Sequence, residues 1–433
     1  MDEANTHEPG GISRTRGLDE LLDDNLNPDT VEIPAGADRL MPSPASVQSN
    51  PTLQQYDREK GRHGQYSWVP GERRVAFNPI TDETRAAYTA GVKQWLSEHH
   101  DMPFDIDGGI PDDLMMVRQS VSKSYRDLMD IYDRDGRARF ITITPTYPGI
   151  LSAVRERNKE PVAVPMHDTD QGWTLDLRAL EHTLRPGDVL ILTNPNNPNG
   201  YVYTEGDLRQ IIALCKKHDV KIISDDVWSD QVHDPAKRHV PIATVAWEMG
   251  YANNVSWLFS TGKAFNTAYI PCSVAVVPNA EVRQQLQSGY DDQPSELGSQ
   301  LAIDTMRSDG DEYVRGLNQR LRKNAELAVS IFREMGCRVH MPESTSVMFI
   351  QLNDVVVGHR NVIMRKLASV FHRKSGVDQS IPELMKELKI GFGMGERFGL
   401  PGYIRLNIGC PYSVLESRLT RLRNSWQAQM RKT

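Results

Sequence analysis

Four short apolar runs in the middle of the chain each stop abruptly at a cluster of polar residues. They cover residues 138–143, 189–192, 220–223 and 255–259, and β-branched or aromatic side chains dominate them, as in buried strands. Helical stretches separate several of these runs; in residues 205–218 the apolar positions recur at i, i+3 and i+4. This alternation predicts a parallel α/β sheet. In such sheets the ligand site lies at the carboxyl ends of the strands, where all four polar clusters fall.

The pattern on either side of these runs predicts the domain organisation. Residues 1–30 are polar and predict a flexible arm, and residues 31–75 are rich in Pro, Gly and Ser, which predicts extended segments that contribute to the small domain and the site. We expect a large domain over residues 76–308, opening with a helix over 81–100, and a smaller α+β domain over residues 309–433. The expected elements of this small domain are helices at 315–336, 362–374 and from 413, and strands at 347–353 and 403–408.

Composition narrows the class of protein. The 433 residues carry a net charge of −7, which argues against a nucleic-acid partner or an anionic membrane. The four cysteines lie far apart without CxxC spacing, so neither a metal site nor a disulfide framework is indicated. Scattered thiols, a polar N-terminus and the lack of a long apolar run together predict a cytoplasmic protein without membrane spans.

The run at 255–259 is followed at once by the sequence Ser260-Thr261-Gly262-Lys263. Small Ser260 and Gly262 leave room around Lys263 and can direct a hydroxyl and backbone amides towards an anion. A poorly hydrated lysine at a strand end can have a pKa low enough to act as a Schiff-base nucleophile. Taken alone, Lys263 would more often be an ordinary surface lysine. The other three strand ends favour the chemical role.

Four motifs, NPNNPNG, ISDD, STGKAFN and YIRLNIGCP, occur in this order along the chain. Together they resemble the pyridoxal 5′-phosphate (PLP) enzymes of fold type I, the aspartate aminotransferase superfamily, and within it most closely the cystathionine β-lyase group. The resemblance runs from about residue 33 to the C-terminus. It implies a three-layer α/β fold with a mixed, mostly parallel large-domain sheet and a smaller α+β domain. It also implies PLP as cofactor, a small-molecule amino-acid substrate, and a homodimer with shared active sites.

The resemblance assigns roles to single residues. Lys263 would hold the cofactor, and Asp225 would keep the ring nitrogen protonated, which makes PLP an effective electron sink. Asn197 resembles the asparagine that contacts the cofactor phenolate oxygen and the substrate. Tyr147 matches the aromatic residue that stacks on the pyridine ring. Arg405 resembles the arginine whose two-pronged hydrogen bond clamps the substrate α-carboxylate.

A phosphate group calls for backbone amides and hydroxyls at the start of a helix. Gly108, Gly109 and Ile110 stand where the family has its phosphate-binding turn, just before a helix that we predict over residues 112–130. Ser260 supplies a hydroxyl from the lysine loop. These residues complete the predicted cofactor site.

The chain also departs from the family pattern. Trp228 stands where the family has Tyr or His near the phenolate oxygen, and an indole can donate a hydrogen bond but not accept one. Gly262 replaces the serine before the lysine, and residues 37–44 match the substrate-side segment only loosely. The family's Gly-Tyr pair, whose tyrosine reaches the phosphate of the neighbouring subunit, is absent, and we expect Tyr66 to take its place. We also expect the segment around Ser295 to contribute to the partner's site. We therefore expect an unusual substrate from specialised metabolism.

These residues are consistent with several reactions of an amino-acid substrate. Our first prediction is β-elimination with cleavage of the C–S bond of a cysteine S-conjugate. The alternatives are transamination and oxygen-dependent decarboxylating oxidative deamination, since all begin with the same attachment of the substrate amine to PLP. A remote alternative is a regulatory protein that keeps the fold without turnover. Intact Lys263, Asp225 and Arg405 argue against this remote alternative.

Overall fold

The computed structural model describes residues 82–100, 102, 104, 110–267, 272–288, 294, 296–307, 310–352 and 381–431. Several predictions lie outside these residues: the two N-terminal segments, the helix at 362–374, Gly108 and Gly109, and Tyr66 and Ser295.

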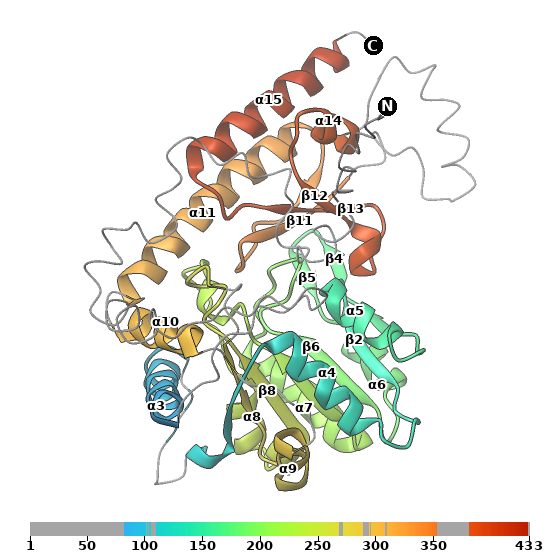
Figure 1. The fold of residues 1–433 in the computed structure, drawn as a ribbon. Helices are drawn as coiled ribbons and strands as arrows, with labels where there is room; N and C mark the ends of the chain where they lie inside the picture. Colours follow the sequence, from blue (N-terminus) through green and yellow to red (C-terminus); the bar gives the residue numbers. More distant parts are fainter. Residues whose placement is uncertain are drawn as a thin grey trace, which may run out of the picture.

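A mixed sheet forms the centre of the larger part of the described structure (Figure 1). The strand order is β1-β9-β8-β7-β6-β2-β3. Strands β3, β2, β6, β7 and β8 run parallel, and β9 runs antiparallel to its neighbours β8 and β1. The bounds are β1 Met115–Arg118, β2 Phe140–Thr144, β3 Val162–Pro165, β6 Val189–Thr193, β7 Lys221–Asp225, β8 Val255–Phe259 and β9 Ser273–Val276. All four predicted strands are confirmed.

Helices cover both faces of this sheet, because successive residues of the buried strands point to opposite sides. Ile222 and Trp257 pack in one hydrophobic cluster, whereas Ile223 and Leu258 pack in another. On the first face lie α3 (Asp82–His99), α6 (Leu177–Thr183), α7 (Glu205–His218), α8 (Ile242–Glu248) and α10 (Glu296–Arg307). On the second lie α4 (Val121–Tyr132), α5 (Pro148–Arg155) and α9 (Ala280–Ser288). A hairpin of β4 (His167–Thr169) and β5 (Gly172–Thr174) projects towards the C-terminal part (Figure 1).

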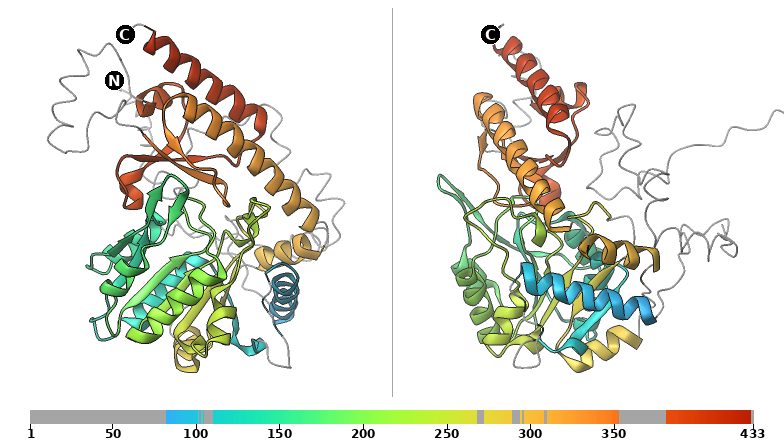
Figure 2. Two further views of the ribbon diagram at one scale, coloured as in Figure 1. Left: turned by 180° about the vertical axis from the view of Figure 1, so that it is seen from behind. Right: turned by 90° about the vertical axis from the view of Figure 1, so that its left-hand side faces the viewer.

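The C-terminal part is built on a separate antiparallel sheet with its own apolar core (Figure 2). Its strand order is β10-β11-β13-β12, and long helices α11 and α15 pack side by side against it. The bounds are α11 Gly310–Glu334, β10 Arg338–Val339, β11 Val347–Gln351, α14 Ile381–Glu387, β12 Phe392–Met394, β13 Tyr403–Asn407 and α15 Tyr412–Met430. In the described part of the chain, no helix has the length and apolar character needed to cross a membrane.

The helix predicted over 112–130 is wrong in its first half. Residues 112–114 form a single 3-10 turn, η3 (Asp112–Leu114), and residues 115–118 form the edge strand β1. The apolar run Met115–Val117 pairs with β9, and this tertiary pairing overrides its local helical character. Helix α4 begins only at Val121, where the Ser120 side chain accepts a hydrogen bond from the Lys123 amide.

Candidate active site

Four neighbouring strands end at one edge of the large sheet, and a predicted site residue lies at each end. β2, β6, β7 and β8 are adjacent and parallel, so their carboxyl ends meet there. Asp225 is the last residue of β7 and is in register with Thr193 of β6 and Leu258 of β8. Tyr147, Asn197 and Lys263 follow the ends of β2, β6 and β8 within four residues. The topology therefore places all four residues on the same rim, the edge of the sheet formed by the carboxyl ends of these strands.

The turn that carries Lys263 is fixed by hydrogen bonds to its backbone. Gln231 Nε2 donates to the carbonyl oxygen of Lys263 at 2.7 Å, and the Gly262 amide donates to Ser260 Oγ at 3.1 Å. The Lys263 ammonium nitrogen lies 5.3 Å from the centroid of the Trp228 ring. Because Trp228 comes three residues after Asp225, this contact brings the lysine and the end of β7 together.

Asp225 is buried, with 4% of its surface exposed. Its Oδ1 accepts a 3.2 Å hydrogen bond from the Val227 amide. It lies two residues after Ile223, so its side chain points to the same face of the sheet, which α4 covers. There burial, with a smaller contribution from the negative charge of Asp225, raises the pKa of Tyr125 to about 12. Tyr125 is therefore a neutral phenol on α4 near the Asp225 carboxylate, and sequence reasoning did not select it.

Tyr147 immediately precedes α5 and is held close to Gly149. A Cβ atom built on Gly149 would lie 2.4 Å from Cε1 of Tyr147 and 3.0 Å from the hydroxyl oxygen of Tyr125. Glycine at 149 thus lets the Tyr147 ring lie directly against the first turn of α5. The two tyrosines and Asp225 form one neighbourhood at the end of β7.

Arg405 reaches this rim from β13 of the C-terminal part. It is 5% exposed, its Nη1 donates to Oδ1 of Asn197 at 3.4 Å, and its guanidinium carbon lies 4.8 Å from the centroid of the Phe398 ring. Phe398 is in turn tied to the β2 end, because its carbonyl oxygen accepts a 3.0 Å hydrogen bond from the Thr146 amide. Sequence reasoning missed Phe398, since an isolated Phe in a short 3-10 helix, here η7 (Gly395–Phe398), carries no motif.

Helix α4 also starts at this edge of the sheet. Arg118 at the end of β1 is in register with Ser273 of β9, and β9 pairs with the end of β8 next to Ser260. The α4 N-terminus therefore leaves the same edge of the sheet as the lysine loop. Of the predicted phosphate-binding turn, only Ile110 is described; it is 1% exposed in the core and is followed by η3 and β1 rather than by the predicted helix.

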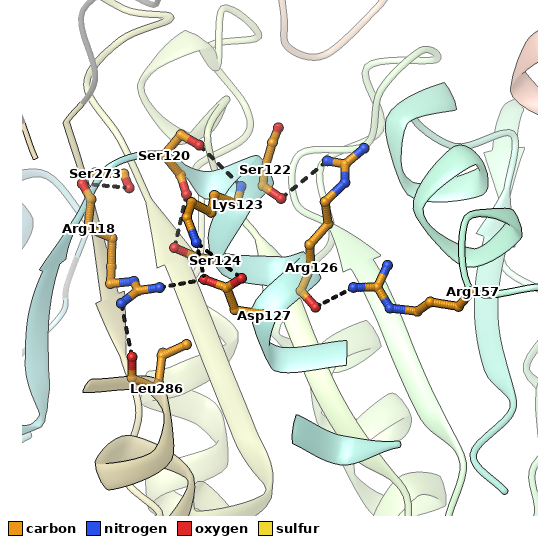
Figure 3. A network of polar contacts seen from close by, with 10 residues as sticks. All are labelled: Arg118, Ser120, Ser122, Lys123, Ser124, Arg126, Asp127, Arg157, Ser273 and Leu286. Carbon is orange, nitrogen blue, oxygen red and sulfur yellow. Dashed lines mark hydrogen bonds and ion pairs between the residues drawn. The ribbon is translucent and has the colours of Figure 1, made fainter. Parts of the chain in front are cut away.

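Ion pairs anchor α4 in this position (Figure 3). Arg118 donates to the Asp127 carboxylate at 2.7 Å and to the carbonyl oxygen of Leu286 at 3.2 Å, while Lys123 reaches Asp127 at 3.0 Å. Arg157 donates to the carbonyl oxygen of Arg126 at 2.7 Å. These contacts join α4 to β1, α9 and the end of α5, so the helix start cannot shift freely.

Comparison with known proteins agrees with this arrangement. Residues 120–422 match the family model of aminotransferase class I and II. The chain belongs to this family. The family depends on PLP, so the predicted cofactor and the predicted resemblance are confirmed.

Individual relatives are distant but cover most of the chain. Cystathionine β-lyase of Corynebacterium glutamicum is 25% identical over 296 residues, which are 67% of this chain and 72% of that protein. Protein MalY of Escherichia coli K12 is 25% identical over 352 residues, 79% of this chain and 82% of that protein. The solved structure of cystalysin from Treponema denticola, which contains PLP, superposes with a TM-score of 0.69 at 19% identity and covers 88% of each chain. The predicted fold class is therefore confirmed.

Proposed function

We propose that this protein is a PLP-dependent lyase that breaks the Cβ–S bond of a cysteine S-conjugate. The observation that carries the proposal is the meeting of Lys263, Asp225 and Arg405 around one rim, at the ends of β8 and β7 and opposite β13. Relatives that carry the name cystathionine β-lyase support the elimination over other outcomes.

The residues on the rim fit the cofactor group by group. Lys263 offers an amine for the PLP aldehyde, and the buried carboxylate of Asp225 suits a protonated ring nitrogen. The half-buried ring of Tyr147 offers a flat face for the pyridine ring. The α4 N-terminus, with Ser260 near it, offers amides and a hydroxyl for the phosphate. We therefore propose the α4 start, rather than a turn at Gly108–Ile110, as the phosphate site.

When bound, PLP supplies an electron-withdrawing ring that stabilises negative charge at Cα of the substrate. The guanidinium of Arg405, stacked on Phe398, would grip the α-carboxylate and fix the direction of the Cα–H bond. The Lys263 amine would accept the Cα proton and pass a proton to the departing sulfur as the Cβ–S bond breaks. Water then converts the remaining carbon skeleton to pyruvate and ammonia.

S-alkyl cysteines test this proposal. The purified protein with PLP should release thiol and pyruvate in equal amounts, and the Lys263→Ala variant should release neither at a comparable rate. Failure of the wild-type protein to release thiol from a broad panel of S-alkyl and S-aryl cysteines would refute the elimination.

Transamination is the second candidate, because the family itself is named for it and several relatives carry aminotransferase names. The two reactions differ in their need for a second substrate. If product formation from an amino acid requires an added keto acid and releases no thiol, the protein is an aminotransferase.

We also propose that the active form is a homodimer that shares its sites, as the family resemblance implies. Sedimentation of the PLP-bound protein should give about twice the mass of the 48.9 kDa chain. A fully active monomer would contradict this.

A further inference from the structure

The two central strands of the C-terminal sheet turn one face towards the large part of the molecule. Phe349 on β11 is directly opposite Arg405 on β13, so the two share a face, and Tyr403 shares it because it lies two residues before Arg405. Phe349 and Tyr403 pack in one cluster with Trp173 and other side chains of the large part. The opposite face packs in the separate core of the C-terminal part. Arg405, the proposed carboxylate clamp, therefore lies on the face between the two parts.

The β4–β5 hairpin of the large part reaches this face (Figure 1), and Asp168 lies on its first strand. Oδ2 of Asp168 accepts a hydrogen bond from the Tyr403 hydroxyl at 2.7 Å, and Oδ1 lies 2.6 Å from Nε2 of His340. Arg338 Nε lies 3.2 Å from the same Oδ1, and Arg338 Nη2 donates to the carbonyl oxygen of Asp168 at 3.2 Å. One residue of the large part thus contacts three polar side chains of the C-terminal part.

The electrostatics of this cluster agree with the distances. The Asp168 side chain is 10% exposed. Burial alone would raise the pKa of Asp168, but the hydrogen bonds from His340 and Tyr403 and the charge of Arg338 hold it below its usual value. Burial, followed by the hydrogen bond to Asp168, raises the pKa of Tyr403 well above its usual value, so the phenol keeps its hydrogen and donates it. Asp168 is therefore an ionised acceptor for all three side chains.

Aromatic rings continue from this cluster to the clamp. Trp173 is the cross-strand partner of Asp168 in the hairpin, so the two side chains lie on the same face of it. The ring centroid of Trp173 lies 5.8 Å from that of Tyr403. Phe349 stacks on Tyr403 with centroids 4.8 Å apart and meets Phe398 edge-on at 5.7 Å. Phe398 is the ring on which the guanidinium of the clamp stacks.

The two parts are also joined at a second place, in the segment that leads into β11. The Thr345 amide donates to the carbonyl oxygen of Gln231 at 2.8 Å, and the His233 amide donates to the carbonyl oxygen of Glu343 at 3.0 Å. These backbone contacts do not involve the hairpin. Loss of the Asp168 contacts would therefore leave the parts joined, while the face of β13 that carries the clamp would be held less firmly.

We propose that Asp168 is a positioning residue that fixes Arg405 for the α-carboxylate of the substrate. By holding the Tyr403 hydroxyl it sets the strand that carries Arg405, and the aromatic stack sets the ring against which the guanidinium lies. A group that is already in place binds its ligand without the cost of ordering it. The inference rests on the proposed role of Arg405 and makes the preference for amino acids over simple amines depend on the hairpin.

Two ligands test this proposal without turnover. 2-Methylalanine has an α-carboxylate but no hydrogen on Cα, so neither elimination nor transamination consumes it, and isopropylamine is the same molecule without the carboxylate. Each is titrated into the PLP-bound protein, and its dissociation constant is read from the cofactor absorbance. We expect Asp168→Asn to weaken binding of 2-methylalanine by about fivefold or more, because fewer molecules have Arg405 in place, and to leave isopropylamine within about twofold.

The hairpin itself offers a matched control. Asp170 also pairs with Arg338, at 3.2 Å, but its side chain is 90% exposed. Asp170→Asn should therefore change both dissociation constants by less than about twofold, as for an exposed ion pair. Tyr403→Phe removes only the hydroxyl that Asp168 accepts from and keeps the ring. It should weaken binding of 2-methylalanine but not of isopropylamine, and it tests the same contact if Asp168→Asn does not fold.

The Arg405→Lys variant separates this inference from the proposed function. If Arg405→Lys weakens binding of 2-methylalanine while Asp168→Asn and Tyr403→Phe do not, or weaken both ligands equally, the role of Asp168 is overturned and the clamp stands. If Arg405→Lys leaves the preference for 2-methylalanine unchanged, the clamp itself fails and this inference fails with it. In the Arg405→Lys background, Asp168→Asn should cause no further loss of that preference, since both changes act through one group. A fully additive loss would show that Asp168 does not act through Arg405.

Discussion

Replacing Arg405 by lysine tests how the substrate is held. In the structure the guanidinium is buried, stacks on Phe398 at 4.8 Å and contacts Asn197 at 3.4 Å. Lysine keeps the positive charge but loses the planar fork that matches a carboxylate, and it stacks less well on an aromatic ring. The Arg405→Lys variant therefore removes geometry rather than charge.

The size of the effect follows from these two losses. One hydrogen bond between charged groups is worth about 1.5–3 kcal/mol. The contact of the cation with the Phe398 ring adds about 0.5–1 kcal/mol. Together they amount to about 2–4 kcal/mol, which corresponds to a decrease in kcat/KM of about 30- to 1,000-fold, since 1.36 kcal/mol is a factor of ten.

The assay compares two substrates that differ only in the carboxylate. Thiol release is measured with an S-alkyl cysteine and with the matching S-alkyl cysteamine, which lacks the α-carboxylate. We expect Arg405→Lys to lower kcat/KM strongly for the amino acid and to leave the slow reaction of the amine within about threefold. Arg397, an exposed residue of the 3-10 helix η7 (Gly395–Phe398), provides the matched control Arg397→Lys, which should change neither rate. An equal loss for both substrates would refute the carboxylate clamp.

Three further predictions concern packing and protonation. Gly149→Ala should weaken PLP binding by up to about tenfold, because the new methyl would displace the Tyr147 ring, whose stacking is worth about 0.5–1.5 kcal/mol; unchanged PLP affinity by equilibrium titration would contradict the contact. Asp226 should make the free energy of unfolding depend on pH, because burial raises its pKa from 3.8 to about 7. Between these two pH values the folded chain keeps a proton that the unfolded chain releases, so the wild-type protein should lose stability with rising pH relative to Asp226→Asn. If urea unfolding gives the same difference in unfolding free energy between wild type and Asp226→Asn at every pH in this range, the prediction is wrong. Phe332→Ala should cost about 3–5 kcal/mol of unfolding free energy, since Phe332 is fully buried in the core of the C-terminal part, whereas exposed Ser330→Ala should change it by less than about 0.5 kcal/mol.

The sequence predicted the strand ends well because each apolar run stops where the chain leaves the core. Asp225, Asn197 and Lys263 follow apolar runs of β-branched, aromatic and leucine side chains that are buried on both faces of the sheet, and short runs of this kind are typical of strands in a parallel sheet. Residues 205–218 predicted α7 with the same bounds, since a capping Thr204 and a left-handed Asp219 close its two ends.

The parts that the sequence did not predict depend on contacts between distant segments. β1 is only four residues long and exists through its pairing with β9, so its residues were assigned to the helix that follows. The position of Phe398 against Arg405 depends on the docking of the C-terminal part on the β2 end. The contact of His100 with His239 joins residues 139 positions apart, and no local pattern reports such a pair.

The most direct test of the proposed active site is to find which lysine carries the cofactor. The PLP-bound protein is reduced with borohydride, digested, and the modified peptide is identified by mass spectrometry. We expect a single phosphopyridoxyl group on Lys263 and none in the Lys263→Arg variant. Modification of a different lysine in the wild-type protein would contradict the site described at the ends of β7 and β8.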